Sequence, residues 1–358
     1  MTMHILPKAG LCRLTDELAE RYALYGPVRR EVSGEVVFDL VSDPSEISLD
    51  APIPNTPPKS VVFPQAERIM SFSFDRETKS ASIERDDLSV SKALVGLRAC
   101  DLNGLLCLDR FFLGQEYVDE VYLDHRKRMF IVSNTCVHPF PQCFCVCTDS
   151  GPAATEGFDL DLTDIGDDYL VLTGSPKGEE LVRKLGLAEA PAAQAALRAK
   201  AVDASVCLFD DQAKDNKAWI SRAVNRITTG FIPYEVWEYI GHQCFECGAC
   251  SFVCPTCSCF NIEDVAAGEG RTGRMRAWDS CSFEGYSRMA GDHNPRKPVE
   301  DRRNKRFFCK LSFSQSKKYL RPGCVGCGRC VRVCPGDIGL PNVVTYIRRE
   351  TIKQVPSE

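Results

Sequence analysis

The chain has 358 residues, of which 26% are charged and 44% hydrophobic, and its formal net charge is −5. This composition is typical of a folded protein with about two domains, and it excludes a disordered chain and a fibrous repeat. Charged residues interrupt the longest apolar stretch, residues 92–114, so we expect no membrane span. A net negative charge without interleaved aromatic and basic residues also argues against nucleic-acid binding.

Cysteine is unusually frequent, with 20 residues in the chain. The first 22 residues contain scattered charges and no apolar run, so a secreted disulfide scaffold is not expected. We therefore expect a cytoplasmic location, where reduced thiolates can bind metal. Twelve of the cysteines lie between Cys244 and Cys334, which indicates a separate C-terminal domain.

The N-terminal part mixes short β-rich runs with Gly and Pro breaks, at residues 34–41, 59–64, 128–135 and 168–174. This pattern predicts an α+β or α/β domain over residues 1–215. The alanine-rich residues 186–204 predict a surface helix. Apolar residues at helical spacing follow from Trp219 to Ile227, with a break near Gly230 and Pro233. We place the domain boundary near residue 215.

Two cysteine runs have the same spacing, C-x2-C-x2-C-x3-C-P, at residues 244–255 and 324–335. This is the spacing of bacterial two-cluster ferredoxins, in which the fourth cysteine of each run binds the other cluster. We therefore expect two [4Fe-4S] clusters. The first would be held by Cys244, Cys247, Cys250 and Cys334, and the second by Cys324, Cys327, Cys330 and Cys254. Gly248, Gly326 and Gly328 would let backbone N–H groups approach the cluster sulfurs.

A zinc site is the alternative, because paired CxxC motifs also bind zinc. Each run, however, holds three cysteines in register, a fourth cysteine and a proline, which favours iron–sulfur clusters. The residues between the runs, 260–320, look mostly helical and are rich in Arg and Lys. We therefore predict a mostly helical dicluster domain over residues 216–358. Its basic residues would either stabilise reduced clusters or form a solvated or subunit-contacting face.

A looser cysteine group lies in the N-terminal domain. Cys100, Cys136, Cys143 and Cys145 could hold a third [4Fe-4S] cluster, with Cys147 competing with Cys145. The alternative is that they are buried free thiols that pack as small apolar side chains. We expect Cys257, Cys259 and Cys281 to be packing residues or neighbours of the ligands, because both ferredoxin-type sets are already complete. A structural role is also expected for His138, and no nucleotide-binding or hydrolase motif is present.

The motifs RACDLNGLLCLDRFF, SNTCVHPFPQCFC, CFECGACSFVCPTCSCF, RAWDSC and CVGCGRCVRVCP occur in this order from about residue 90 onward. Together they resemble the family of iron–sulfur subunits that anaerobic sulfite reductase shares with sulfhydrogenase, where the member is called subunit beta. The resemblance implies ligand roles for the eight ferredoxin-type cysteines. It also aligns Cys100, Cys136, Cys143 and Cys145 with recurrent positions of that family.

By resemblance, the chain would be an electron-transfer subunit of an oxidoreductase complex in anaerobic metabolism rather than a stand-alone enzyme. Its partners would be a flavin-containing subunit that handles NAD(P)H and a catalytic or heterodisulfide-reductase-like subunit. Two other hypotheses stay open. The N-terminal cysteine-rich domain could itself reduce a small sulfur substrate, or it could serve only as a docking platform with buried thiols.

Overall fold

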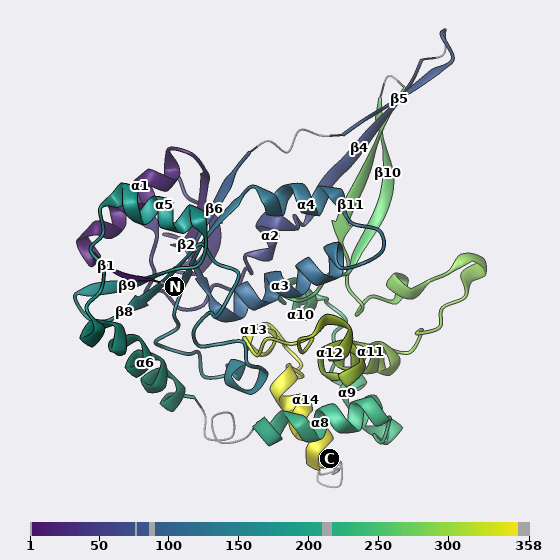
Figure 1. Cartoon of the computed structure of the whole chain (residues 1–358). Coiled ribbons are helices and arrows are strands. Elements are labelled where there is room, and N and C mark those ends of the chain that lie inside the picture. Colours follow the sequence, from purple (N-terminus) through teal and green to yellow (C-terminus); the bar gives the residue numbers. More distant parts are fainter. Residues whose placement is uncertain (1, 76, 86–89, 210–216, 269, 350–358) are drawn as a thin grey trace.

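The computed structural model describes residues 2–75, 77–85, 90–209, 217–268 and 270–349. A seven-stranded sheet has the order β1-β9-β8-β7-β6-β2-β3 (Figure 1). Its central strands β2, β6, β7 and β8 are parallel, and the outer strands pair antiparallel. The strand bounds, in sheet order, are Met3–Pro7, Asp168–Thr173, Leu160–Asp164, Met129–Asn134, Lys92–Arg98, Ala23–Arg29 and Val36–Leu40.

The central strands are buried on both faces, as parallel strands between helical layers usually are. In β6, Ala93 and Val95 point to one core, whereas Leu94 and Leu97 point to the other. The alternation shifts by one residue at Gly96, where a bulge interrupts pairing with β7. Gly96 has φ +80°, and an added Cβ there would lie 2.8 Å from the Leu49 side chain. Only glycine fits this position.

Helices cover both faces of the large sheet (Figure 1). On one face, α1 (Leu11–Ala19) and α5 (Pro176–Leu185) bury their leucines against β6, β7 and β8. On the other face lie α2 (Lys59–Val62), α3 (Ala99–Leu113) and α4 (Glu120–Lys127). The alanine-rich segment forms α6 (Ala192–Cys207), in which only Ser205 is buried, so the expected surface helix is present.

A second sheet joins segments that are almost 200 residues apart in the chain. It has the order β10-β11-β4-β5, with bounds Phe260–Gly268, Arg271–Trp278, Ala66–Asp75 and Ser80–Glu84. All its pairs are antiparallel, and the four strands project from the rest of the chain as an arm (Figure 1). Arg276 lies opposite Glu67 in the register, and their side chains form an ion pair near the base of the arm.

The C-terminal helices pack around a third core. Trp219 and Ile227 of one helix pack there with Trp237 and Phe307 of two others. These helices are α8 (Lys217–Thr229), α9 (Tyr234–His242), α11 (Val299–Leu311), α12 (Phe313–Tyr319) and α14 (Leu340–Arg349). The predicted helix and its break are confirmed, because α8 ends before Gly230 and Pro233 caps α9. Short helices α10 (Ala249–Phe252) and α13 (Arg329–Arg332) carry the third cysteine positions of the two runs.

The expectation of a mixed α/β N-terminal part agrees with the structure, although residues 59–64, expected as a β-rich run, begin with helix α2 instead. The expectation of a mostly helical C-terminal part is not confirmed. The segment between the cysteine runs opens with the β10–β11 hairpin, which turns at Gly268 and Gly270, both with positive φ. Its partner strand β4 comes from the N-terminal part, so local sequence could not reveal the pairing. The expected boundary near residue 215 lies in residues 210–216, outside the described residues.

Candidate iron–sulfur centres

The two cysteine runs fold into nearly identical loops. Gly248 and Gly328 both have φ +73°, and each caps the short helix that carries the third cysteine of its run. Two residues after the first cysteine, the backbone N–H donates to its sulfur, at 3.4 Å from Glu246 to Cys244 and 3.3 Å from Gly326 to Cys324. These bonds fix the sulfur positions before any ligand is considered. The spacing therefore encodes a local structure that occurs twice.

The loops also pack against each other in a crossed arrangement. An added Cβ at Gly336, two residues after Cys334, would lie 1.8 Å from the carbonyl oxygen of Gln243, beside Cys244. At the other crossing, Thr256 donates a 2.7 Å hydrogen bond to the carbonyl of Gly323, beside Cys324. The fourth cysteine of each run is thus brought to the start of the other run. This arrangement is what exchanged ligation requires.

One equivalent position differs between the runs. Glu246 and Gly326 both adopt a left-handed backbone, with φ +53° and +64°. An added Cβ at Gly326 would lie 2.5 Å from the amide nitrogen of Cys145, so glycine is required there. Glu246 instead pairs with Arg302. The second run is therefore covered by the N-terminal cysteine loop. The first run lies at the surface, because Cys247 is exposed and Phe245, which follows Cys244, is 70% exposed.

The N-terminal cysteines gather beside the second run. Cys100 is in the first turn of α3, directly after β6, and Cys136 lies two residues past the end of β7. Cys143 and Cys145 are buried, and the sulfur of Cys143 is 3.5 Å from the carbonyl oxygen of Cys327. The amide of Phe144 donates to the carbonyl of Gly326 at 2.8 Å. Cys147 belongs to the same core and also lines a cavity between α8 and α11.

A buried ion pair joins the two groups of cysteines. Arg329, between Cys327 and Cys330, donates to both carboxylate oxygens of Asp101 at 2.6 and 2.8 Å, and to the carbonyl of Pro54 at 2.6 Å. The Arg329 and Asp101 side chains are 0% and 2% exposed. Asp101 follows Cys100 directly. The pair therefore locks the start of α3 to the loop of the second run.

Other buried cations near the cysteines bind no carboxylate within the described part of the chain. Arg98 donates to the carbonyls of Leu49 and Ala51, both at 2.9 Å. Arg306 donates to the Cys250 carbonyl at 2.8 Å, and Lys310 to Thr256 at 2.7 Å. Lys59 donates to the Cys257 carbonyl at 2.9 Å. Because a buried charge is costly without a counter-charge, these cations indicate that anionic groups belong beside them.

The two runs differ electrostatically. Burial raises the pKa of the Cys327 thiol and raises that of Cys330 to about 12, because a thiolate loses its hydration there. Burial also acts on Cys250, but the charges of Arg306 and Arg303 outweigh it, and the pKa of Cys250 is lowered. The first run therefore has the more cationic surroundings. Negative charge is easier to place at the Cys250 sulfur than at the sulfurs of Cys327 and Cys330.

Sequence reasoning missed the residues that hold the cysteine groups together. Nothing in the sequence pointed to Lys59. The only hints for Asp101 and Arg329 were their positions, with Asp101 beside Cys100 and Arg329 between two candidate ligands. His138, expected to be structural, accepts a contact from the Cys136 sulfur through its backbone carbonyl at 3.5 Å. Cys257, Cys259 and Cys281 line one cavity together, which their spacing did not suggest.

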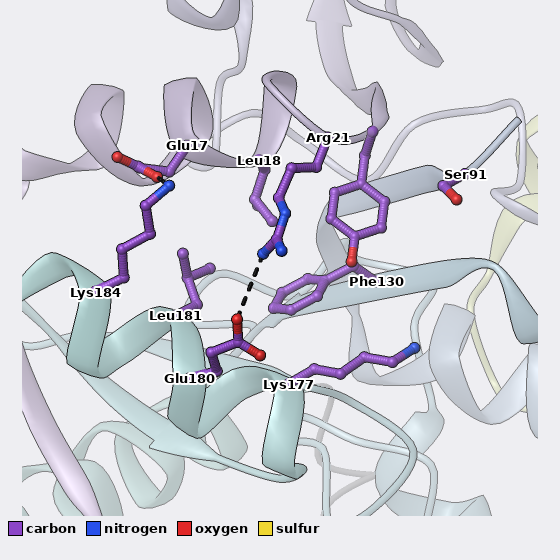
Figure 2. Close-up of a pocket in the computed structure, with 10 residues that line it drawn as sticks. Glu17, Leu18, Arg21, Ser91, Phe130, Lys177, Glu180, Leu181 and Lys184 are labelled. Carbon is purple, nitrogen blue, oxygen red and sulfur yellow. Dashed lines mark ion pairs between the residues drawn. The ribbon is translucent and has the colours of Figure 1, made fainter.

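A pocket between α1 and α5 is not part of this site (Figure 2). No cysteine lines it, and its charged side chains pair across it, with Arg21 lying 3.6 Å from Glu180 and Lys184 contacting Glu17. In the described ranges no three His, Cys, Asp or Glu side chains are grouped as for a single metal ion. None of the described helices is both long and apolar enough to span a bilayer.

The residues present fit [4Fe-4S] clusters. The repeated thiol sets, the N–H groups aimed at sulfur, the glycines without room for a Cβ and the buried cations all meet the needs of an anionic cluster. A family model described as a 4Fe-4S dicluster domain matches residues 243–338. No solved structure matches the chain.

Sulfhydrogenase 2 subunit beta of Pyrococcus furiosus is 30% identical over 347 residues, which cover 94% of this chain and 96% of that protein. The match spans both the N-terminal cysteines and the two runs. It therefore extends well beyond the dicluster domain. The chain accordingly belongs to the sulfhydrogenase subunit beta family, with a 4Fe-4S dicluster domain in its C-terminal part.

Proposed function

We propose that the chain is the electron-transfer iron–sulfur subunit of a cytoplasmic multi-subunit oxidoreductase. It would relay electrons between a flavin-containing subunit that handles NAD(P)H and a catalytic or heterodisulfide-reductase-like subunit. Membership of a sulfhydrogenase subunit family supports a role within a complex. In this proposal residues 1–215 and 216–358 are the two modules, joined by the sheet that they share.

The observation that carries the proposal is a core shared by cysteines from both parts of the chain. Cys244 and the second run belong to the same core as Cys100, Cys143 and Cys145. Cys247 of the first run is exposed at the surface. A subunit with this arrangement can accept an electron at one face and release it elsewhere.

In this proposal the first cluster is held by Cys244, Cys247, Cys250 and Cys334, and the second by Cys324, Cys327, Cys330 and Cys254. The crossed packing of the runs supports the exchange of Cys334 and Cys254. A third cluster is held by Cys100, Cys136, Cys143 and Cys145. Cys147 faces a cavity between α8 and α11, whereas the backbone of Cys145 lies against Gly326 of the second run, which favours Cys145 as the ligand. Buried Arg98 supplies a nearby positive charge.

When bound, the clusters supply one-electron transfer, and the chain determines their potentials. Backbone N–H groups orient the sulfurs, and the apolar helices around the second run exclude water. Arg303, which is 1% exposed, places a guanidinium nitrogen 3.9 Å from the Cys250 sulfur. The cations around Cys250 thus favour the more negatively charged, reduced state of the first cluster.

The test is iron and acid-labile sulfide per chain after anoxic purification, at about four irons for each cluster. Cys247→Ala and Cys327→Ala should each remove about four irons. Cys100→Ala and Cys145→Ala should do the same if the third cluster exists, whereas the matched variant Cys147→Ala should remove none. Unchanged iron in Cys247→Ala and Cys327→Ala would refute the proposal. Unchanged iron in Cys100→Ala and Cys145→Ala would mean that the electron path includes only the two clusters of the dicluster domain.

A second test concerns activity. Once chemically reduced, the isolated chain should pass electrons to artificial dyes, but it should not turn over sulfite, hydrogen or NAD(P)H by itself. Dye reduction should be slower in Cys247→Ala, because this variant removes the surface-exposed ligand of the first cluster. Robust turnover of any of these substrates by the chain alone would contradict the proposed role.

One observation favours the alternative, a catalytic N-terminal domain. A cavity of about 420 Å³ lies at the carboxyl ends of β6, β7 and β8, lined by Arg98, Asn134, His138, Asp164 and Tyr169. Ligands commonly bind at this edge of a parallel sheet. If a small sulfur substrate is reduced there, His138→Ala should abolish turnover and leave the iron content nearly unchanged. The electron-transfer proposal expects no such turnover to lose.

A further inference from the structure

Three cysteines outside all the assigned sets meet in one cavity of about 360 Å³, between the first run, α3 and α11. Cys257 and Cys259 follow the first run, and Cys281 follows β11. Two more thiols complete the wall, Cys107 from α3 and Cys309 from α11. A single water needs only about 10–15 Å³ of such space, so the cavity can hold a group of many atoms.

The wall of this cavity is positively charged. Lys305, Arg306 and Lys310 line it, and no Asp or Glu is among the described residues of the wall. Arg306 and Lys310 are 5% and 7% exposed, and neither forms an ion pair with a carboxylate in the described part of the chain. Arg306 instead lies 3.8 Å from the Cys257 sulfur. An anion bound in the space that these buried cations face would compensate their charge.

Lys59 adds to this charge from behind the cavity. Its ammonium group is buried, donates to the backbone carbonyl of Cys257 at 2.9 Å and lies 4.0 Å from the centre of the Trp278 ring. The lysine also donates to the Ser251 carbonyl of the first run at 3.4 Å. It therefore fixes the Cys257 turn to the first run.

We propose that this cavity binds a further [4Fe-4S] cluster through Cys257, Cys259, Cys281 and Cys309. Thiolate ligands and a net negative cluster match both the thiols and the cations of the wall. On assembly, each thiol loses its proton to solvent as its sulfur bonds to iron, and the iron and sulfide come from the supply that loads the two runs. The inference rests on the proposed function, because it extends the same electron path.

The position of the cavity gives this cluster a role. Thr256 separates Cys254, a ligand of the second cluster, from the Cys257 turn, and it accepts a hydrogen bond from Lys310 at 2.7 Å. Tyr286 lies in the wall and is partly exposed, so the cavity approaches the surface on that side. The cluster would thus give the second centre its own route to the surface, separate from Cys247. One route can serve the donor and the other the acceptor.

The first test uses the full chain purified without oxygen. Cys259→Ala and Cys281→Ala should each lower the iron content by about four per chain and leave the signals of the ferredoxin-type clusters in electron paramagnetic resonance. Cys309→Ala should do the same. Cys107→Ala should not, because the Cys107 sulfur already contacts the Pro322 carbonyl at 3.9 Å. The exposed cysteines Cys12 and Cys207 provide matched controls, whose alanine variants should keep all iron.

A second measurement needs no variant and so does not depend on folding of the mutants. In native anoxic protein, Cys257, Cys259, Cys281 and Cys309 should resist alkylation, and they should become reactive once a chelator removes iron. Alkylation of these four thiols in protein that retains its ferredoxin-type iron would overturn this inference and leave the proposed function intact. Zinc in place of iron at this site would also overturn it. If the two runs themselves hold no iron in the native anoxic protein, the proposed function is refuted instead.

Discussion

The buried pair of Asp101 and Arg329 offers the sharpest test of how the two cysteine groups are held together. Asp101→Asn removes the negative charge and leaves the guanidinium, 0% exposed, without a counter-ion. Two charge-assisted hydrogen bonds of 2.6 and 2.8 Å are lost or weakened, each worth about 1.5–3 kcal/mol. This sum agrees with the roughly 3–5 kcal/mol that breaking a buried ion pair costs.

The assay is the rate of unfolding in guanidinium under anoxic conditions, followed by tryptophan fluorescence. If the pair is broken in the transition state of unfolding, a loss of about 3–5 kcal/mol accelerates unfolding by roughly 10²–10⁴. Asp264→Asn is the matched control, because Asp264 makes the same two-bond contact with Arg274, at 2.7 and 2.8 Å, on an exposed strand. This exposed pair should contribute about 1 kcal/mol at most to the free energy of unfolding.

A double-mutant cycle separates the pair from its parts. Arg329→Met alone should also be strongly destabilising, since it leaves Asp101 as an unpaired buried charge. The double variant should be much less destabilised than the sum of the two single changes. Additive effects, or unfolding of Asp101→Asn within about threefold of the parent rate, would show that the pair does not hold the two groups together.

Three other features of the structure give expectations of the same kind. Arg303→Met should lower the reduction potential of the first centre in a redox titration at unchanged iron content, and the exposed Arg288→Met should not. Gly326→Ala should lower both the iron content and the stability, because the added Cβ would meet the Cys145 backbone. Gly230 also has a positive φ but has open space around it, so Gly230→Ala should lower the free energy of unfolding in urea by only about 1–3 kcal/mol. Burial raises the pKa of Glu67, but the hydrogen bond from His125 and the charge of Arg276 outweigh it, so its folded pKa is lowered. The stability it contributes is complete above its ordinary pKa of 4.5 and is lost as the pH falls through the folded value, so Glu67→Gln should flatten the acid limb of stability against pH.

The features that depend on short spacing were predictable from the sequence. The C-x2-C-x2-C-x3-C pattern, with Gly248 and Gly328 at equivalent positions, is enough to build each loop, because the turns and the N–H bonds to sulfur involve neighbouring residues. The buried parallel strands were also readable, since residues such as those of β6 and β7 are largely apolar. The break between α8 and α9 followed from Gly230 and Pro233.

How these parts meet depends on the folded chain. The hairpin β10–β11 pairs with β4, Arg329 finds Asp101, and the thiols of Cys257, Cys281 and Cys309 line one cavity. Each of these contacts joins segments that are far apart in the chain, and the cavity brings together a few of the twenty cysteines. Their stability comes from burial and from charge compensation in the folded interior, and neither exists in any local stretch of sequence. The spacing of the cysteines in the two runs therefore predicted iron–sulfur centres, whereas only the fold determines which of the other thiols lie together.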